Sequence, residues 1–330
     1  MLLSLSAACV FAQSSLIATL SHEGEITPFY GANALKEAHE AAVHGDAITL
    51  SSGTFIATDI TKAIILRGAG MQLDTINQIL PTEISGDFTI NVADNVTDKL
   101  TIESIYHNHR ITVKGTLKEA RFIKNRLKEL SCSFATDGAL SHCNFIHCMI
   151  VGLFKVTSSG TDCIVSNSYI AQFSYLRNST SAMSFSNSIL NGPLYEYDKC
   201  SFVNCVLIGS DFNDAYDRLP SNATAYNCVA VNCYGNDCFV NIPNTTNTSS
   251  TYAAVFKDFT GIYNDDITFE LTDGAKTKFL GTDGTQIGIY GGNFPYTPIS
   301  TNPRITKCNV AAKSTADGKL SVDIEVAGAE

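Results

Sequence analysis

The segment Phe145-Ile-His-Cys-Met-Ile150 is matched further along the chain by Phe185-Ser-Asn-Ser-Ile-Leu190. Four more segments have the same form, at residues 122–127, 165–170, 202–207 and 230–235. We align all six on one anchor position, which holds Asn125, His147, Asn167, Asn187, Asn204 and Asn232. These anchors are 22, 20, 20, 17 and 28 residues apart. A repeat of this length predicts the coils of a β-solenoid, with an insertion in the last coil.

Three columns of similar side chains accompany the anchors. The position four residues before the anchor holds Cys143, Cys163, Met183, Cys200 and Cys228; the position two before it holds Phe145, Val165, Phe185, Phe202 and Ala230; and the position one after it holds Cys148, Ser168, Ser188, Cys205 and Cys233. Strand alternation places these columns inside the solenoid. Because successive coils are about 4.8 Å apart, we expect the asparagines to stack in an amide-to-amide ladder.

The cysteine spacing predicts small buried core residues. A zinc site needs ligands that converge tetrahedrally, whereas this spacing gives rows along the solenoid. We therefore expect mostly free thiols, with a disulfide inside a column as the alternative. The segment 122–127 fits less well, since Arg121 and Arg126 fall in inward columns. Either the register shifts there or the anchor Asn125 is misassigned.

The N-terminal region contains three further patterns. Residues 33–44 have helical periodicity, and they precede Gly45-Asp-Ala-Ile-Thr-Leu-Ser-Ser-Gly-Thr-Phe55 and Lys62-Ala-Ile-Ile-Leu-Arg-Gly-Ala-Gly70. This run resembles the N-terminus of right-handed parallel β-helix proteins of the pectate-lyase-like superfamily. The resemblance implies an all-β, single-stranded right-handed parallel β-helix, and the period of about 20 residues predicts about ten coils. It also implies a capping helix near residues 33–43, which would cover the open end of the solenoid.

The C-terminal region extends the resemblance to roughly residues 30–326. Thr282-Asp-Gly-Thr-Gln-Ile-Gly-Ile-Tyr-Gly-Gly292, followed by Phe294-Pro-Tyr296, looks like the closing coil of secreted bacterial members. Residues 303–326 then read as two strands around Ala316-Asp-Gly318, which predicts a closing hairpin. The expected organisation is a signal peptide at 1–12, a β-helix domain at 13–310 and a strand or hairpin segment at 311–330.

Composition and targeting point to an exported protein. Residues 1–12 are apolar and end in Val10-Phe11-Ala12, which suits signal-peptide cleavage; lipidation at Cys9 is the alternative. We expect a secreted, periplasmic or surface-displayed bacterial protein. No apolar run is long enough for a transmembrane helix. The net charge of −10 argues against nucleic acid as a partner, and we expect a monomer.

The fold alone leaves the function open, because β-helices serve lyases, hydrolases, adhesins and spacers. The acidic calcium motif and the arginine-containing catalytic motif of pectate lyases have no match in the sequence. The leading hypothesis is therefore a carbohydrate-binding protein without catalysis, with a polysaccharide or glycan as partner. One alternative is a divergent polysaccharide lyase acting on a uronate-containing glycan, with Arg110, Lys114 or Lys124 as the catalytic cation. The other alternative is a structural or adhesive spacer.

A cluster of basic residues is the first candidate binding site. Residues 110–128 contain seven of the 22 basic residues of the chain and a single acid, Glu119. Such a local inversion of charge would attract an anionic polysaccharide. The ligand-binding candidates in this cluster are Lys118, Lys124 and Lys128; the alternative is a solvated turn without a ligand.

The insertion of the last coil, residues 210–220, is the second candidate. Asp211, Asp214, Tyr216, Asp217 and Arg218 are its candidate ligand-binding residues. Among them Asp211, Asp214 and Asp217 carry the hard oxygen donors that calcium prefers, and the sequence implies no other cofactor. A neutral-glycan site built on Tyr216 and Tyr226 is the rival to the basic cluster.

Overall fold

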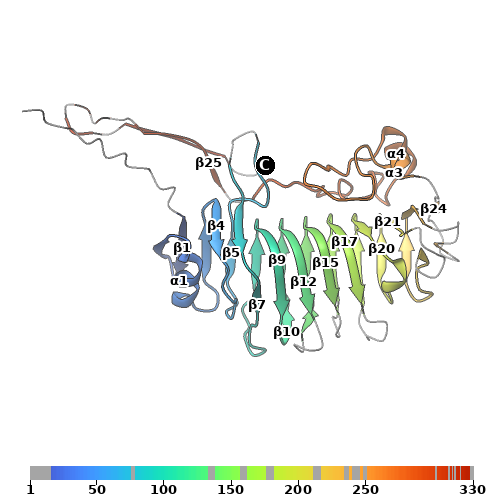
Figure 1. Cartoon of the computed structure of the whole chain (residues 1–330), viewed down its shortest axis with the longest axis horizontal. Helices are drawn as coiled ribbons and strands as arrows, with labels where there is room; N and C mark the ends of the chain where they lie inside the picture. Colours follow the sequence, from blue (N-terminus) through green and yellow to red (C-terminus); the bar gives the residue numbers. More distant parts are fainter. Residues whose placement is uncertain are drawn as a thin grey trace, which may run out of the picture.

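The computed structural model describes residues 16–75, 79–132, 138–156, 162–175, 182–210, 217–233, 238–239, 246–247, 251–301, 303–310, 313, 315, 317–319 and 321–327. Its strands build a parallel β-solenoid of about 8 turns (Figure 1). The predicted mostly-β parallel solenoid is thus confirmed, with fewer turns than the ten expected. The expected signal peptide and Cys9 lie outside the described residues.

One long sheet, which we call sheet A, follows one face of the solenoid. Its first three strands pair antiparallel, and all later neighbours pair parallel. In spatial order it contains β2 (Glu25–Tyr30), β1 (Ile17–His22), β3 (Ala47–Leu50), β5 (Ile65–Arg67), β8 (Thr101–Glu103), β11 (Arg121–Ile123), β14 (Asn144–Ile146), β16 (Cys163–Ser166), β18 (Met183–Ser186), β20 (Ser201–Val203) and β22 (Thr224–Tyr226).

A second long sheet, sheet B, forms the next face, and its strands are parallel. In spatial order it contains β24 (Thr246–Asn247), β23 (Val229–Val231), β21 (Val206–Ile208), β19 (Ile189–Asn191), β17 (Tyr169–Tyr175), β15 (Met149–Val156), β12 (Arg126–Cys132), β9 (Tyr106–Val113), β6 (Thr82–Ser85) and β4 (Gly53–Ile56). The strand β7 (Phe88–Ile90) also pairs with β9. A short third face pairs β10 (Thr116–Lys118) with β13 (Ala139–Ser141), and a 3-10 turn, η2, spans Leu194–Glu196.

The helix α1 (Ala34–Ala41) lies at the N-terminal end of the solenoid, where it contacts strands β1 to β4 (Figure 1). The sequence predicted this helix from its apolar periodicity. Its buried side chains are Ala34, Leu35, Ala38 and His39. The small alanines allow the helix to pack closely against the first strands.

The strand registers correct two of the predicted anchors. Phe122 pairs with Phe145 and Ile123 with Ile146, so Lys124, not Asn125, is the counterpart of His147. At the other end Val203 pairs with Tyr226, so the counterpart of Asn204 is Asn227, not Asn232. The corner residues of successive coils are therefore Lys124, His147, Asn167, Asn187, Asn204 and Asn227.

The same register corrects the inward columns at their last member. Ala223 replaces Cys228 in the first column, Ala225 replaces Ala230 in the second, and Cys228 replaces Cys233 in the third.

Backbone conformation explains why asparagine recurs at the corner. Each corner residue has a positive φ, between 44° at Asn187 and 57° at Asn204. Asparagine tolerates this left-handed region better than most residues with a Cβ. The expected amide-to-amide ladder is wrong for Asn167 and Asn204, because their side chains bond to the C-terminal part of the chain.

The column after the corner is an internal hydrogen-bonded ladder. The backbone N–H of Cys148 donates to Ser168 Oγ at 2.9 Å, and that of Ser168 donates to Ser188 Oγ at 3.3 Å. Each hydroxyl in turn donates to the carbonyl two residues earlier. Nine cysteines of the described chain are buried, with no disulfide among them: Cys132, Cys143, Cys148, Cys163, Cys200, Cys205, Cys228, Cys233 and Cys238.

Replacement of Cys205 by serine should change the free energy of unfolding by less than about 1 kcal/mol. Serine already occupies this column in two coils, and its hydroxyl can replace the Cys205 thiol as donor to the Val203 carbonyl. Urea unfolding of Cys205→Ser and Cys205→Ala checks this. A serine variant less stable than the alanine variant would contradict the ladder.

Residues 251–301 form a C-terminal segment that runs back along the outside of sheet B (Figure 1). It contains α3 (Tyr252–Val255) and α4 (Asp273–Lys278). A second hydrophobic core lies beneath it, separate from the core inside the solenoid. Outward side chains of sheet B contribute Met149, Tyr169, Ile189, Val206 and Val229 to this core. Residues 282–296 therefore lie along the side of the solenoid, not in the closing coil that the resemblance implied.

The chain ends in the predicted pair of strands. β25 (Arg304–Val310) pairs antiparallel with β26 (Val322–Ala327). The hairpin extends away from the solenoid (Figure 1).

Candidate functional site

The corner residues hold the last part of the C-terminal segment, residues 281–301, which we call the strap. Lys124 Nζ donates to the Ile299 carbonyl at 2.7 Å, and His147 Nε2 donates to the Phe294 carbonyl at 2.9 Å. The Asn167 amide donates to the carbonyls of Ile289 and Gly291, at 2.9 and 2.8 Å. Asn204 Oδ1 accepts from the Thr282 backbone N–H at 2.9 Å. The strap is thus bonded along the corner between sheets A and B.

Arg126 fastens the middle of the C-terminal segment to sheet B. Its guanidinium lies 4.5 Å from the centroid of the Tyr106 ring and 5.8 Å from that of Tyr263, and it bonds to Asp265 at 2.8 Å. Cation–π contacts of this kind are strongest where the cation is partly desolvated. Arg126 therefore fills a structural role in holding the C-terminal segment.

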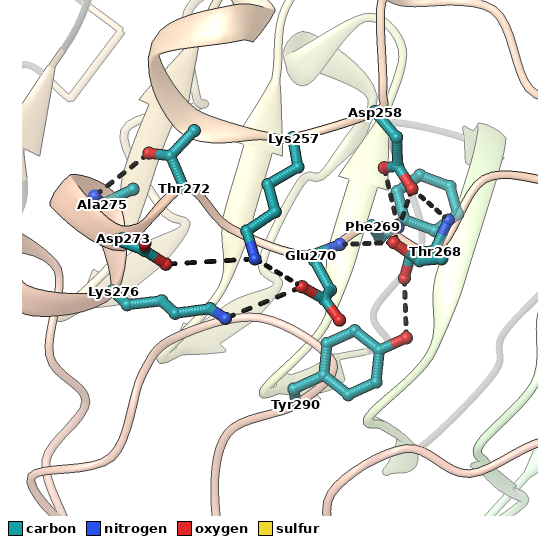
Figure 2. A network of polar contacts seen from close by, with 10 residues as sticks. All are labelled: Lys257, Asp258, Thr268, Phe269, Glu270, Thr272, Asp273, Ala275, Lys276 and Tyr290. Carbon is teal, nitrogen blue, oxygen red and sulfur yellow. Dashed lines mark hydrogen bonds and ion pairs between the residues drawn. The ribbon is translucent and has the colours of Figure 1, made fainter.

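A polar network holds the C-terminal segment together internally (Figure 2). Lys257 Nζ bonds to Glu270 at 2.8 Å, and this hydrogen bond raises the pKa of Lys257 and lowers that of Glu270. Asp258 accepts from the backbone N–H groups of Thr268 and Phe269. This network is exposed, and its lysines are paired with carboxylates. It therefore stabilises the C-terminal segment and is not a site with free cations.

The structure distributes the basic cluster around one coil instead of along one side. Lys124 lies buried under the strap, and Lys118 lies on the third face, 3.9 Å from Asp94. Arg121 is exposed on the outer face of sheet A. Arg110, Lys114 and Lys128 belong to sheet B or the turn that follows β9, and Arg110 is paired with Glu129 at 2.8 Å. The three catalytic candidates Arg110, Lys114 and Lys124 are therefore not brought together.

The insertion is only partly described. Asp217 is buried, and its Oδ1 accepts from both the backbone N–H and the hydroxyl of Ser210 at 2.8 Å, while Arg218 is exposed. Asp211, Asp214 and Tyr216 lie outside the described residues. The described part of the chain contains no cluster of three side chains able to hold a metal.

Half of the outer face of sheet B remains open, and this half is basic. Lys128 and Lys155 lie on the adjacent strands β12 and β15, while Arg110 and Lys114 lie one coil before them. The neighbouring carboxylates are Glu129 and Asp87.

The outer face of sheet A between β14 and β22 has the opposite character, because no charged side chain points outward from its strands. Strand alternation turns ten described side chains outward on these five strands, and none of them is ionisable except the phenol of Tyr226. They form two rows across adjacent coils. One row is Asn144, Ile164, Ser184, Ser201 and Thr224, and the other is Ile146, Ser166, Ser186, Val203 and Tyr226.

We call these ten residues the neutral face. One hydrogen bond follows a row, in which Ser201 Oγ donates to Ser184 Oγ at 3.0 Å. Tyr226 ends one row with 46% of its surface exposed. At the other end the strap places Phe294, which is 77% exposed, beside the corner that follows β14. An uncharged, hydroxyl-bearing sheet face with exposed aromatics can contact both the hydroxyls and the apolar ring faces of a sugar chain.

Tyr226 was among the residues predicted from the sequence, and the other nine residues of the neutral face were not. The outward serines follow from the same alternation that predicts the inward columns. That signal is present in Met183-Ser-Phe-Ser186, where each inward residue is followed by a serine. The basic cluster and the long insertion of the last coil are the stronger signals in the sequence.

The protein should lose stability in mild acid. Burial lowers the pKa of His147, with a smaller contribution from the Lys124 charge, and burial also lowers the pKa values of His39 and His107. The unfolded chain, where histidine titrates near pH 6.5, then binds more protons than the folded chain. The free energy of unfolding should therefore fall as the pH drops below about 6.5, by up to about 1.4 kcal/mol per pH unit for each histidine.

Urea unfolding as a function of pH checks this dependence. His147→Gln, which keeps a side-chain donor for the Phe294 carbonyl but cannot titrate, should show a shallower slope. His142→Gln is the control, because His142 is exposed. An unchanged slope in the His147 variant would contradict the assignment.

Comparison of the chain with family models, with curated proteins and with solved structures finds no match in any of the three. Within the part of the chain that the structure describes, no helix is long and apolar enough to cross a membrane.

Proposed function

We propose that the protein binds a neutral polysaccharide without cleaving it, and that the glycan lies across the neutral face of sheet A. The proposal includes export from a bacterial cell, a monomeric state and a right-handed solenoid capped by α1. The observation that carries it is the absence of ionised side chains from ten described outward positions on five consecutive strands.

The chemistry of the neutral face supports this ligand class. Neighbouring coils repeat the serine, threonine and asparagine groups at intervals of about 4.8 Å, so a glycan chain would meet a regular series of hydroxyls. Ile164, Val203 and Tyr226 are exposed among these groups and can cover apolar sugar faces. No strong electrostatic attraction is involved, so the affinity should be nearly independent of salt.

The test is calorimetry with a panel of soluble neutral polysaccharides and co-sedimentation with insoluble ones, at low and at high salt. Tyr226→Ala should weaken binding about tenfold. Ser184→Asp should abolish it, because the new carboxylate would be desolvated under the glycan. Thr112→Asp, on the open half of sheet B, is the matched control and should bind normally. Binding that survives both substitutions on the neutral face would refute the proposed site.

A second candidate ligand is an anionic polysaccharide on the open half of sheet B, which the four cations Arg110, Lys114, Lys128 and Lys155 favour. Each exposed cation should contribute only about 0.5 kcal/mol, so binding needs several contacts and weakens steeply with salt. A Lys128→Ala, Lys155→Ala double variant tests it in the same calorimetric series. Formation of unsaturated uronate, followed by ultraviolet absorbance, would instead support the lyase alternative. If no glycan binds, the spacer alternative is favoured.

A further inference from the structure

A pocket of about 210 Å³ lies between the loop after β5 and the strap, outside both the neutral face and the basic half of sheet B. The loop contributes Gly70, Leu73, Asp74 and Ile79, and the strap contributes Pro298 and Ser300. These two segments are more than 200 residues apart in the sequence. We propose that this pocket binds a single neutral, hydroxyl-bearing sugar ring.

The size and the walls of the pocket indicate this class of ligand. A volume of about 210 Å³ is sufficient for one small ring. Leu73, Ile79 and Pro298 supply aliphatic walls, while Asp74 and Ser300 supply oxygen atoms that can accept hydrogen bonds. No cation lines the pocket within the described residues, and the Asp74 carboxylate disfavours an anionic ligand.

Two glycines in Arg67-Gly-Ala-Gly70 have different roles. A Cβ on Gly68 would lie 2.3 Å from the Ser104 carbonyl oxygen, so this position is glycine for close packing of the loop on the next coil. Gly70 is buried, yet a Cβ there would have the Gln72 carbonyl oxygen, at 3.6 Å, as its nearest neighbour among the described atoms. Because Gly70 lines the pocket, a larger side chain at this position would occupy part of the pocket volume.

The pocket depends on the docked strap. Lys124 Nζ holds the Ile299 carbonyl at 2.7 Å, directly between Pro298 and Ser300. The Thr301 hydroxyl bonds to Glu103, which also lies 3.5 Å from Arg67 Nε. A ligand that contacts both walls binds only the docked form, so it should raise the melting temperature of the protein.

The experiment measures saturation-transfer NMR and thermal shifts with neutral methyl glycosides, with glucuronate and with cyclohexanol. We expect a neutral glycoside to bind and to raise the melting temperature, and the other two compounds to bind at least about tenfold more weakly. In a Ser184→Asp background, where the neutral face no longer binds glycan, Gly70→Leu should abolish the binding. Gly274→Leu is the matched control, since a Cβ there meets no described atom within 4 Å.

Three outcomes would overturn the proposal: no glycoside binds, glucuronate or cyclohexanol binds equally well, or binding persists in Gly70→Leu. If Gly70→Leu does not fold, Asp74→Asn replaces it and should weaken binding at least about tenfold. Tyr226→Ala must retain glycoside binding, because it alters only the neutral face. The pocket and the polysaccharide site can therefore fail independently.

Discussion

Tyr169→Ala should lower the free energy of unfolding by about 3–5 kcal/mol. Tyr169 projects outward from sheet B, yet it is completely buried under the C-terminal segment. Its ring centroid lies 4.3 Å from that of Phe269 and 5.6 Å from that of Tyr263. Truncation to alanine leaves a cavity between two parts of the chain that cannot collapse without moving the segment.

Urea unfolding measures this loss, and Tyr226→Ala is the control. Tyr226 occupies an outward position on sheet A and is 46% exposed, so its removal should change the stability by only about 1 kcal/mol or less. Equal effects of the two substitutions would mean that the C-terminal segment does not bury sheet B in solution.

Gly291→Ala should destabilise the protein by about 3 kcal/mol. A Cβ at this position would lie 2.0 Å from the Gln286 carbonyl oxygen, and the collision is with backbone that cannot rotate away. The carbonyl of Gly291 also accepts the Asn167 amide, so a shift of the turn would break one of the bonds that hold the strap.

The measurement for Gly291→Ala is the melting temperature together with hydrogen exchange of the strap amides. Gly274→Ala in α4 is the control, because its Cβ has open space and alanine favours helix by about 1 kcal/mol. Gly291→Ala with the stability of the unchanged protein would contradict the turn geometry.

The sequence predicted the solenoid because its inward columns repeat at nearly constant spacing. The prediction failed by one residue at Asn125, where an asparagine that bonds inside the coil resembled a corner residue. Asn125 accepts from the Ile105 N–H and donates to the Ile102 carbonyl, which is a position of the inner ladder. At Asn232 it failed because two Asn-Cys pairs, Asn227-Cys228 and Asn232-Cys233, follow each other in one coil.

The site was harder to predict, because the strap decides which side chains are free. Lys124 and Arg126 look like binding cations in the sequence, but the C-terminal segment engages both of them. Their partners Ile299 and Asp265 lie more than 130 residues away, and no local pattern connects them. The neutral face, by contrast, depends only on strand alternation and could have been predicted from the sequence.

The late position of the C-terminal segment in the chain has a consequence for the order of events during biosynthesis. The ribosome completes the coils before it reaches residues 251–301, so Met149, Tyr169, Ile189, Val206 and Val229 emerge as an uncovered apolar stripe on sheet B. The strap then forms contacts that span from 78 to 198 residues of sequence, and contacts of such long range form slowly. During that interval the nascent solenoid exposes a surface on which another chain can adhere, and the delay before the strap docks sets how long this hazard lasts.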